Sequence, residues 1–279
     1  MSVLYIAEAD FIKRPAGKRV SDMKLQWLGH ACFAITHKGY TIVIDPYNSD
    51  YTAGYPKLRI KADMVLVSHE HFGHNYREGV ILSGRPESDC PFTITKLRVP
   101  HEFKMGNWRG FCDIHILEAD GMKLVHMSDL GTQLDGGQIS RLYGADVCMI
   151  CAGSATALPS QEAKRATDEI MAKVIIPMHY RDENRGAHRL ESVEEFINHF
   201  ESPEYIHRYN TDTLEIQPDL EPQVAVLKYQ GPSPWWRGCS KRHRRASPGA
   251  DLRTWSRTCL TLSSPTTATS CSTRHSSVT

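Results

Sequence analysis

Short β-rich segments in the first half of the chain, followed by alternating buried strands and helices, predict an α/β fold. The first half is rich in hairpin signals, since residues 31–36 and 40–45 are β-rich and a short Lys38-Gly39 turn joins them. A second hairpin is predicted over residues 113–126, because its two halves flank Asp120-Gly121, a favoured turn pair.

The second half alternates between strands and helices. Apolar runs at 145–150 and 174–177 are short and bounded by polar residues, which predicts buried strands. Residues 160–173 begin with Ser and have an Ala-rich body, and residues 190–200 are amphipathic, so both segments are predicted to be helices. Further strands are predicted at 24–29, 64–67, 93–99, 213–216 and 224–227.

Composition divides the chain into three parts. Residues 1–23 are polar and irregular, residues 24–230 hold the predicted core, and residues 231–279 are a Ser/Thr-rich tail. The tail has eight Lys or Arg against one acid, Asp251, so it is either a basic interaction arm or a disordered or non-native segment. The remainder is mildly acidic without a basic stripe, so we expect no nucleic-acid partner.

The expected cellular location rests on the membrane and secretory segments that the sequence does not show. No apolar run approaches the roughly 20 residues of a membrane span, and the first residues carry acids instead of a basic leader, so we expect neither a membrane segment nor a secretory signal. Eight cysteines without a framework pattern predict reduced thiols and a cytoplasmic location. Cys148 and Cys151 have CxxC spacing, but without a second pair they are expected to be buried core.

Three histidines follow the predicted strand at 64–67. His69, His71 and His74 lie within six residues, and neutral imidazole is the commonest metal ligand near neutral pH. In an extended turn His69 and His71 can point the same way, while His74 is displaced towards a second point. This pattern suits two adjacent metals, and the alternative is a histidine-rich surface loop without metal.

Four other candidate ligands share one feature: each follows a predicted strand. Because the carboxyl ends of neighbouring strands meet at one rim, residues far apart in the chain can converge there. A carboxylate among them can bridge two metals, and imidazoles can complete both coordination shells. These candidates are Asp45, His101, Asp129 and His179.

Five segments carry a resemblance to a known superfamily. They are Leu28-Gly-His30-Ala-Cys-Phe, Ile44-Asp45-Pro46, Ser68-His69-Glu-His71-Phe-Gly73-His74, His126-Met-Ser-Asp129-Leu-Gly131 and Ile176-Pro-Met-His179-Tyr180. In this order they resemble the motifs of metallo-β-lactamase-fold hydrolases, and within that superfamily the branch that includes L-ascorbate-6-phosphate lactonase. The resemblance covers about residues 24–230 and implies a four-layer αβ/βα sandwich with a metal site on the rim between two mixed β-sheets.

The resemblance also implies roles for individual residues. His69, His71 and His101 would hold the first metal, and His74 and His179 part of the second. Asp129 would bridge the metals, and Asp45 would support the ligand loop from behind. The roles of His30 and His126 are left open. Each could contact substrate, support a metal ligand, or be a buried histidine whose ring is hydrogen-bonded by the backbone.

One position departs from the superfamily motif. The motif reads His-x-His-x-Asp-His, and this chain has Gly73 where the Asp belongs. Glycine can neither bind a metal nor handle a proton. We therefore expect one firmly bound metal and a second, weakened site.

The predicted function is that of a metal-dependent hydrolase. A metal-bound hydroxide would attack a small polar ester, lactone or phosphoester, with Asp129, His74 and His179 in the catalytic centre. Zn²⁺ is the expected metal, and Mn²⁺ or Fe also suits such ligands. The expected partner is a small-molecule substrate, without membrane or nucleic acid, and homo-oligomerisation is left open. The alternative is a catalytically impaired member, crippled by Gly73, that serves as a metal-binding or interaction protein.

Overall fold

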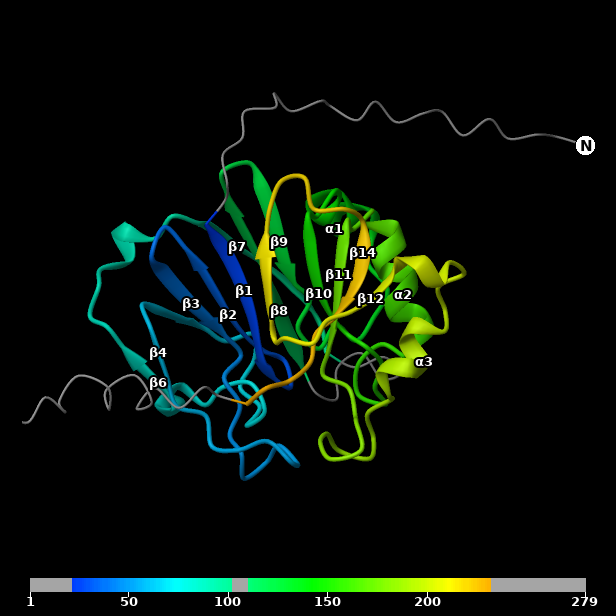
Figure 1. Cartoon of the computed structure of the whole chain (residues 1–279), viewed down its shortest axis with the longest axis horizontal. Coiled ribbons are helices and arrows are strands. Elements are labelled where there is room, and N and C mark those ends of the chain that lie inside the picture. The colour runs from blue at the N-terminus through cyan, green and yellow to red at the C-terminus, as the bar shows by residue number, and fades with distance from the viewer. Residues whose placement is uncertain (1–21, 102–109, 232–279) are drawn as a thin grey trace, which may run out of the picture. The chain divides into compact units, whose positions relative to one another are not determined.

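The computed structural model describes residues 22–101 and 110–231 of the chain, and these residues form two large β-sheets (Figure 1). The predicted tail after residue 231 and nearly all of the irregular segment 1–23 lie outside the described residues. The three-part division of the chain therefore stays a prediction.

The first sheet has five strands in the order β13-β1-β2-β3-β5. Strand β3 pairs in parallel with β5, and the other neighbours are antiparallel, so the sheet is mixed. The strands are β1 (Met23–Gly29), β2 (Cys32–His37), β3 (Tyr40–Ile44), β5 (Met64–Leu66) and β13 (Thr213–Ile216).

The second sheet has seven strands in the order β12-β14-β11-β10-β9-β8-β7. The pairs from β12 to β9 are parallel, and β9-β8-β7 is an antiparallel meander. The strands are β7 (Thr93–Pro100), β8 (Phe111–Ala119), β9 (Met122–His126), β10 (Val147–Cys151), β11 (Val174–Met178), β12 (Ile206–Arg208) and β14 (Gln223–Val226). The predicted pair of mixed sheets is confirmed.

The outer layers of the two sheets differ. The described α-helices are α1 (Gly136–Leu142), α2 (Ser160–Glu169) and α3 (Val193–Ile197), and they cover the outer side of the seven-stranded sheet (Figure 1). The outer side of the five-stranded sheet carries instead the small sheet of β4 (Ile60–Ala62) and β6 (Val80–Leu82), together with loops. Short 3₁₀ helices occur at Arg77–Gly79, Glu87–Asp89 and Pro203–Tyr205.

The main hydrophobic core lies between the two large sheets. Its members on the five-stranded sheet alternate along the strands, as a one-sided buried face requires, and include Leu25, Trp27, Phe33 and Ile35. A smaller cluster fills the opposite face of that sheet, where Val43 packs with loop and β4–β6 residues. Both faces of the five-stranded sheet are thus covered. The edge at which its strands end is left for a site.

Several element boundaries differ from the sequence predictions. The helix predicted over 160–173 ends at Glu169, because the chain turns at Met171, whose φ is +51°. The helix predicted over 190–200 is shorter, since the Ser192 side chain caps it and Leu190 lies in a β-bridge. Helix α1 was not predicted, because its Gly136-Gly137 start has poor helix propensity. A capping box between Asp135 and Gln138 compensates.

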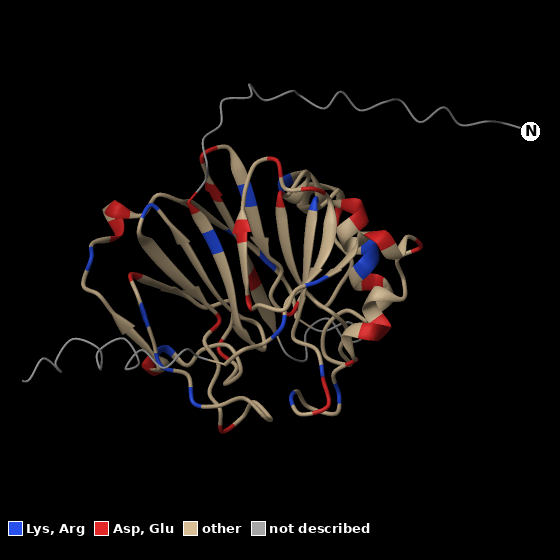
Figure 2. Ribbon diagram, in the orientation of Figure 1, with Lys and Arg blue, Asp and Glu red and all other residues tan. Residues whose placement is uncertain are grey.

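The described chain contains no helix long and apolar enough to cross a membrane. Basic and acidic residues are interspersed over both sheets, the helices and the loops, as Figure 2 shows.

A buried histidine gives a prediction about stability. His115 on β8 is fully buried, neither ring nitrogen has a hydrogen-bond partner among the described residues, and burial lowers its pKa to about 4. Below pH 6.5 the unfolded chain therefore takes up a proton that the folded chain refuses, so stability falls as the pH falls towards 4. We expect His115→Leu to remove this loss, which is about 2 kcal/mol at pH 5.

The measurement is urea unfolding of wild type and variant at pH 7.5 and pH 5.0. An apolar replacement for an unpartnered buried ring should cost little at pH 7.5. The exposed His188→Leu serves as the matched control and should unfold like wild type at both pH values. An equal loss of stability at low pH in His115→Leu and wild type would contradict the prediction.

Candidate metal centre

The predicted ligands lie together at the rim where the strands of both sheets end, which is the lower edge in Figure 1. Asp129 is at the centre. Its Oδ2 is 3.3 Å from His74 Nε2, 3.5 Å from His101 Nε2 and 3.9 Å from His69 Nε2. Its Oδ1 is 2.9 Å from His179 Nδ1. One carboxylate therefore faces four imidazoles, which come from loops after β5, β7 and β11.

The first group consists of His69, His71 and His101, each with one potential ligand atom within 4.8 Å of the others. His101 Nε2 is 3.1 Å from His71 Nδ1, and His101 Nδ1 is 3.1 Å from the Thr156 carbonyl oxygen. Donation from Nδ1–H to that carbonyl leaves Nε2 as a lone-pair donor towards the centre. This trio contains the three residues expected to hold the first metal.

The second group consists of His30, His74 and His179, whose potential ligand atoms also lie within 4.8 Å of one another. His30 comes from the turn between β1 and β2, and His179 follows β11, so the group joins the two sheets. The rings of His30 and His179 are perpendicular with centroids 3.9 Å apart. Sequence reasoning left the role of His30 open, and the structure places it among the ligand candidates.

Asp45 supports the centre from behind. Its Oδ1 accepts a hydrogen bond from the Ser68 backbone N–H at 2.7 Å, and its Oδ2 accepts one from the Ser68 hydroxyl at 2.6 Å. The same Oδ2 is 2.9 Å from His74 Nδ1. His74 Nδ1 is thereby occupied, and its Nε2 is directed at Asp129. The resemblance implied a supporting role for Asp45, and these contacts place its carboxylate against Ser68 and His74.

Backbone conformation at the rim is strained. Non-glycine residues with positive φ include His30 (+54°), Asp45 (+49°), Ser128 (+54°) and His179 (+54°). Each of these lies just after a strand, and the left-handed conformation costs an L-residue roughly 1–2 kcal/mol. The turn redirects the chain so that the side chain at the strand end lies in the site. Such strain clusters at functional sites because the surrounding fold holds it.

The charges within the centre are strongly coupled. Burial opposes ionisation of Asp129 and Asp45, but the neighbouring imidazoles hold the pKa of both carboxyl groups below the ordinary range. Burial likewise opposes a charge on His74, yet the Asp129 and Asp45 carboxylates raise its pKa to about 10. Burial and the His74 charge lower the pKa of His69 to about 2. Without metal, His74 therefore holds the proton that neutralises part of the acidic centre.

The donor set fits metal ions. His69 Nε2 and His30 Nδ1 are buried and have no hydrogen-bond partner among the described residues. Unpartnered buried polar atoms are costly, so two of them in one cluster need a common explanation. Imidazole nitrogens and carboxylate oxygens at a rim between two sheets are ligands that Zn²⁺ uses.

Two further side chains, His126 and Cys151, lie beside the predicted ligands. His126 lies beside the centre but is satisfied by the protein, because Nε2 is 2.8 Å from the Ala31 carbonyl oxygen and Nδ1 accepts from the Ser128 backbone N–H. Both of its ring nitrogens therefore have partners within the protein. Cys151, expected to be plain core, ends β10 with its Sγ 3.6 Å from His179 Nδ1, and it forms a donor group with His179 and Asp129. Burial raises the pKa of this thiol, so it is protonated without metal.

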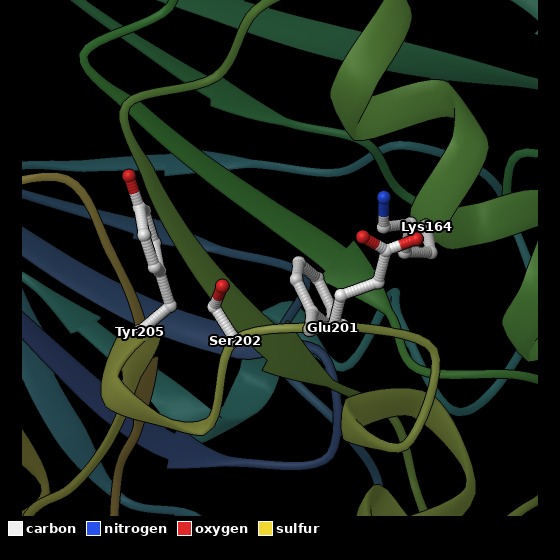
Figure 3. Close-up of a pocket in the computed structure, with 5 residues that line it drawn as sticks. Lys164, Glu201, Ser202 and Tyr205 are labelled. Carbon is white, nitrogen blue, oxygen red and sulfur yellow. The ribbon is translucent and has the colours of Figure 1, made fainter.

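A separate hollow of about 300 Å³ lies between α2 and the segment at 200–205. Figure 3 shows Lys164 and Glu201 on one side of it and Ser202 and Tyr205 on the other. None of these residues belongs to the histidine groups. The potential metal ligands lie at the rim, so the candidate site is the rim and not this hollow.

The role of Asp45 can be tested by substitution. Asp45→Asn keeps the shape but removes the charge that fixes His74, so we expect metal affinity to fall about 10–100-fold. The measurement is a Zn²⁺ titration of stripped protein by competition with a metal-sensitive dye. Asp50→Asn, at an exposed position, is the matched control and should bind like wild type. Equal affinities for Asp45→Asn and wild type would exclude a supporting role for Asp45.

Comparisons with known proteins agree with this geometry. A UPF0173 metal-dependent hydrolase of Hyperthermus butylicus is 24% identical over 193 residues, which cover 56% of this chain and 82% of that protein. A UPF0173 protein of Pyrococcus furiosus is 29% identical over 199 residues, which cover 62% and 89%. These relatives are matched over most of their own length and over somewhat more than half of this chain.

A solved structure is similar as well. A candidate Zn-dependent hydrolase of the metallo-beta-lactamase superfamily from Thermotoga maritima has 30% sequence identity and a TM-score of 0.56, covering 74% of this chain and 98% of that one. The family described as Beta-lactamase superfamily domain matches residues 24–179, from β1 to the ligand candidate after β11. With two mixed sheets and the histidine–aspartate rim already described, the chain belongs to the metallo-β-lactamase superfamily.

Proposed function

We propose that this protein is a metal-dependent hydrolase acting on a small polar ester, lactone or phosphoester. The observation that carries the proposal is the buried cluster of imidazoles around Asp129 at the rim of the two sheets. The similarity to proteins named metal-dependent hydrolases supports it. Assignment to the L-ascorbate-6-phosphate lactonase branch rests on the motif resemblance alone.

The residues of the centre have separable tasks. When bound, Zn²⁺ lowers the pKa of a coordinated water and polarises the substrate oxygen. His69, His71 and His101 would hold one ion, and His74 and His179 would contribute to a second. Asp129 contacts imidazoles of both groups, and its carboxylate would orient the attacking water and accept its proton.

The substrate is proposed to be a small polar molecule. Arg189 is exposed, and its positive charge adds to the lowering of the His30 pKa, after burial and the neighbouring imidazoles. Basic and acidic residues are interspersed in the described part of the chain (Figure 2), which supports a small-molecule substrate in preference to a nucleic acid.

Location and metal identity belong to the same proposal. The described cysteines, Cys32, Cys90, Cys112, Cys148 and Cys151, are all free thiols, which supports a reducing, cytoplasmic setting. Imidazole-rich sites suit Zn²⁺, and Mn²⁺ or Fe are the alternatives. The competing hypothesis, a catalytically impaired member, rests on Gly73 and predicts metal binding without turnover.

An activity assay distinguishes the active hydrolase from the catalytically impaired member. A panel of simple lactones and phosphodiesters is assayed with added Zn²⁺ or Mn²⁺, and the enzyme should be stimulated by metal. We expect His71→Ala to lower turnover at least about 100-fold, since loss of a ligand costs more than the 10–100-fold typical of its supporting partners. His207→Ala, at an exposed position, is the control. Full turnover in His71→Ala would refute the mechanism, and metal binding without turnover in wild type would favour the impaired member.

A further inference from the structure

Gly73 occupies the place of the superfamily's second-metal carboxylate, and the structure shows what fills the space. A Cβ added at Gly73 would lie 2.9 Å from His30 Nε2 and 3.5 Å from His30 Cδ2. The imidazole of His30 therefore takes the volume into which an aspartate side chain at position 73 would extend.

The backbone does not require glycine at this position. The φ of Gly73 lies outside the left-handed range in which L side chains are strained, in contrast to Gly29 at +104°. The neighbour that limits a side chain at 73 is the His30 ring. The His30 ring can therefore occupy its present position because residue 73 has no side chain.

His30 is placed as a ligand would be. It is buried at 7% exposure, its Nδ1 has no hydrogen-bond partner among the described residues, and it shares a 4.8 Å donor group with His74 and His179. His126, the other histidine of uncertain role, has protein partners on both nitrogens. A buried imidazole nitrogen without a hydrogen-bond partner, beside two predicted ligands, is explained if a ligand or metal binds there.

The backbone holds His30 against His179. The His30 carbonyl oxygen accepts hydrogen bonds from the Trp27 indole N–H and from the His179 backbone N–H, both at 3.0 Å. Both residues have φ of +54°. The backbone hydrogen bond thus joins the two turns, and the two rings lie with centroids 3.9 Å apart.

We propose that His30 is a ligand of the second metal and replaces the missing carboxylate of position 73. This inference rests on the proposed function only in requiring that the rim binds metal. With His30, the second site has three imidazoles and shares Asp129, so it has a complete set of four donors despite Gly73. The weakened second site expected from the motif alone is replaced by a site of different composition.

The exchange of carboxylate for imidazole changes metal preference. Nitrogen donors favour Zn²⁺, whereas carboxylate oxygens favour Mn²⁺ and other hard ions. The site with His30 also carries one negative charge fewer than a site with aspartate. The second site of this protein is thus expected to discriminate against Mn²⁺ more strongly than a site built with a carboxylate.

The test is metal binding by the full chain, measured without reference to activity. Stripped wild type, His30→Ala and His30→Ala/Gly73→Asp are titrated with Zn²⁺ and separately with Mn²⁺, and bound metal is counted by elemental analysis after gel filtration. His115→Ala is the matched control, a buried histidine with unpartnered nitrogens outside the donor groups. Far-UV circular dichroism of each metal-free variant checks folding.

We expect two Zn²⁺ per chain in wild type and in His115→Ala, and one in His30→Ala, with second-site affinity at least about 100-fold lower. The double variant should regain the second ion, because the aspartate side chain enters the space that the ring leaves. Its preference for Zn²⁺ over Mn²⁺ should be smaller than that of wild type.

Other outcomes overturn the inference in distinguishable ways. Two ions bound with unchanged affinity in folded His30→Ala would remove His30 from the ligands and leave the hydrolase proposal intact. One ion in wild type would do the same and favour a mononuclear centre. A double variant that stays at one ion would show that His30 does not substitute for the carboxylate. No ion in wild type would overturn the proposed function as well.

Discussion

A single buried carboxylate governs the architecture of the rim. Asp129 is 3% exposed, and four imidazoles from three loops lie within 3.9 Å of its oxygens. An isolated charge at this depth would be strongly unfavourable, so the fold must supply positive charge nearby. Without metal, protonated His74 does so, held between Asp129 and Asp45. With metal, the ions would take over that role and release the proton.

The rest of the structure serves to bring these groups together. The ligands are far apart in the chain, and only the parallel and mixed pairing of the strands gives their carboxyl ends a common rim. Left-handed turns at His30, Asp45 and His179 then aim the side chains into the site, at a cost in backbone energy. The large intersheet core makes that cost tolerable, since it fixes the strand ends from which the turns start.

The sequence predicted the main sheets and named most of the side chains that the structure brings together at the rim, because both depend on strong local patterns. Buried strands such as 174–178 are nearly continuous apolar runs, and the ligand candidates follow them directly. Elements stabilised by tertiary contacts or capping were missed, including β4, β6, β12 and α1. Their segments are short or contain glycine, so local propensity does not reveal them.

Within the site, sequence reasoning reached its limit at His30 and Cys151. Nothing local distinguishes His30 from His126, because the difference lies in whether the ring nitrogens meet protein partners. Cys151 looked like core because strand alternation does not tell which residue is the last one before the rim. Gly73 is the informative position in the sequence. A ligand motif that lacks one ligand side chain indicates that another side chain occupies the same space, and here that side chain is His30.

The position of His30 also changes what metal binding would do to the fold. A carboxylate at position 73 would belong to the same loop as His69 and His74, whereas His30 belongs to the β1–β2 turn of the five-stranded sheet. His179 belongs to the seven-stranded sheet, and the two turns already share a backbone hydrogen bond. An ion held by both would cross-link the sheets where their strands end. Because a ligand at 100 times its dissociation constant stabilises the folded state by about 2.7 kcal/mol, occupancy of the proposed second site would stabilise the contact between the two halves of the sandwich against unfolding.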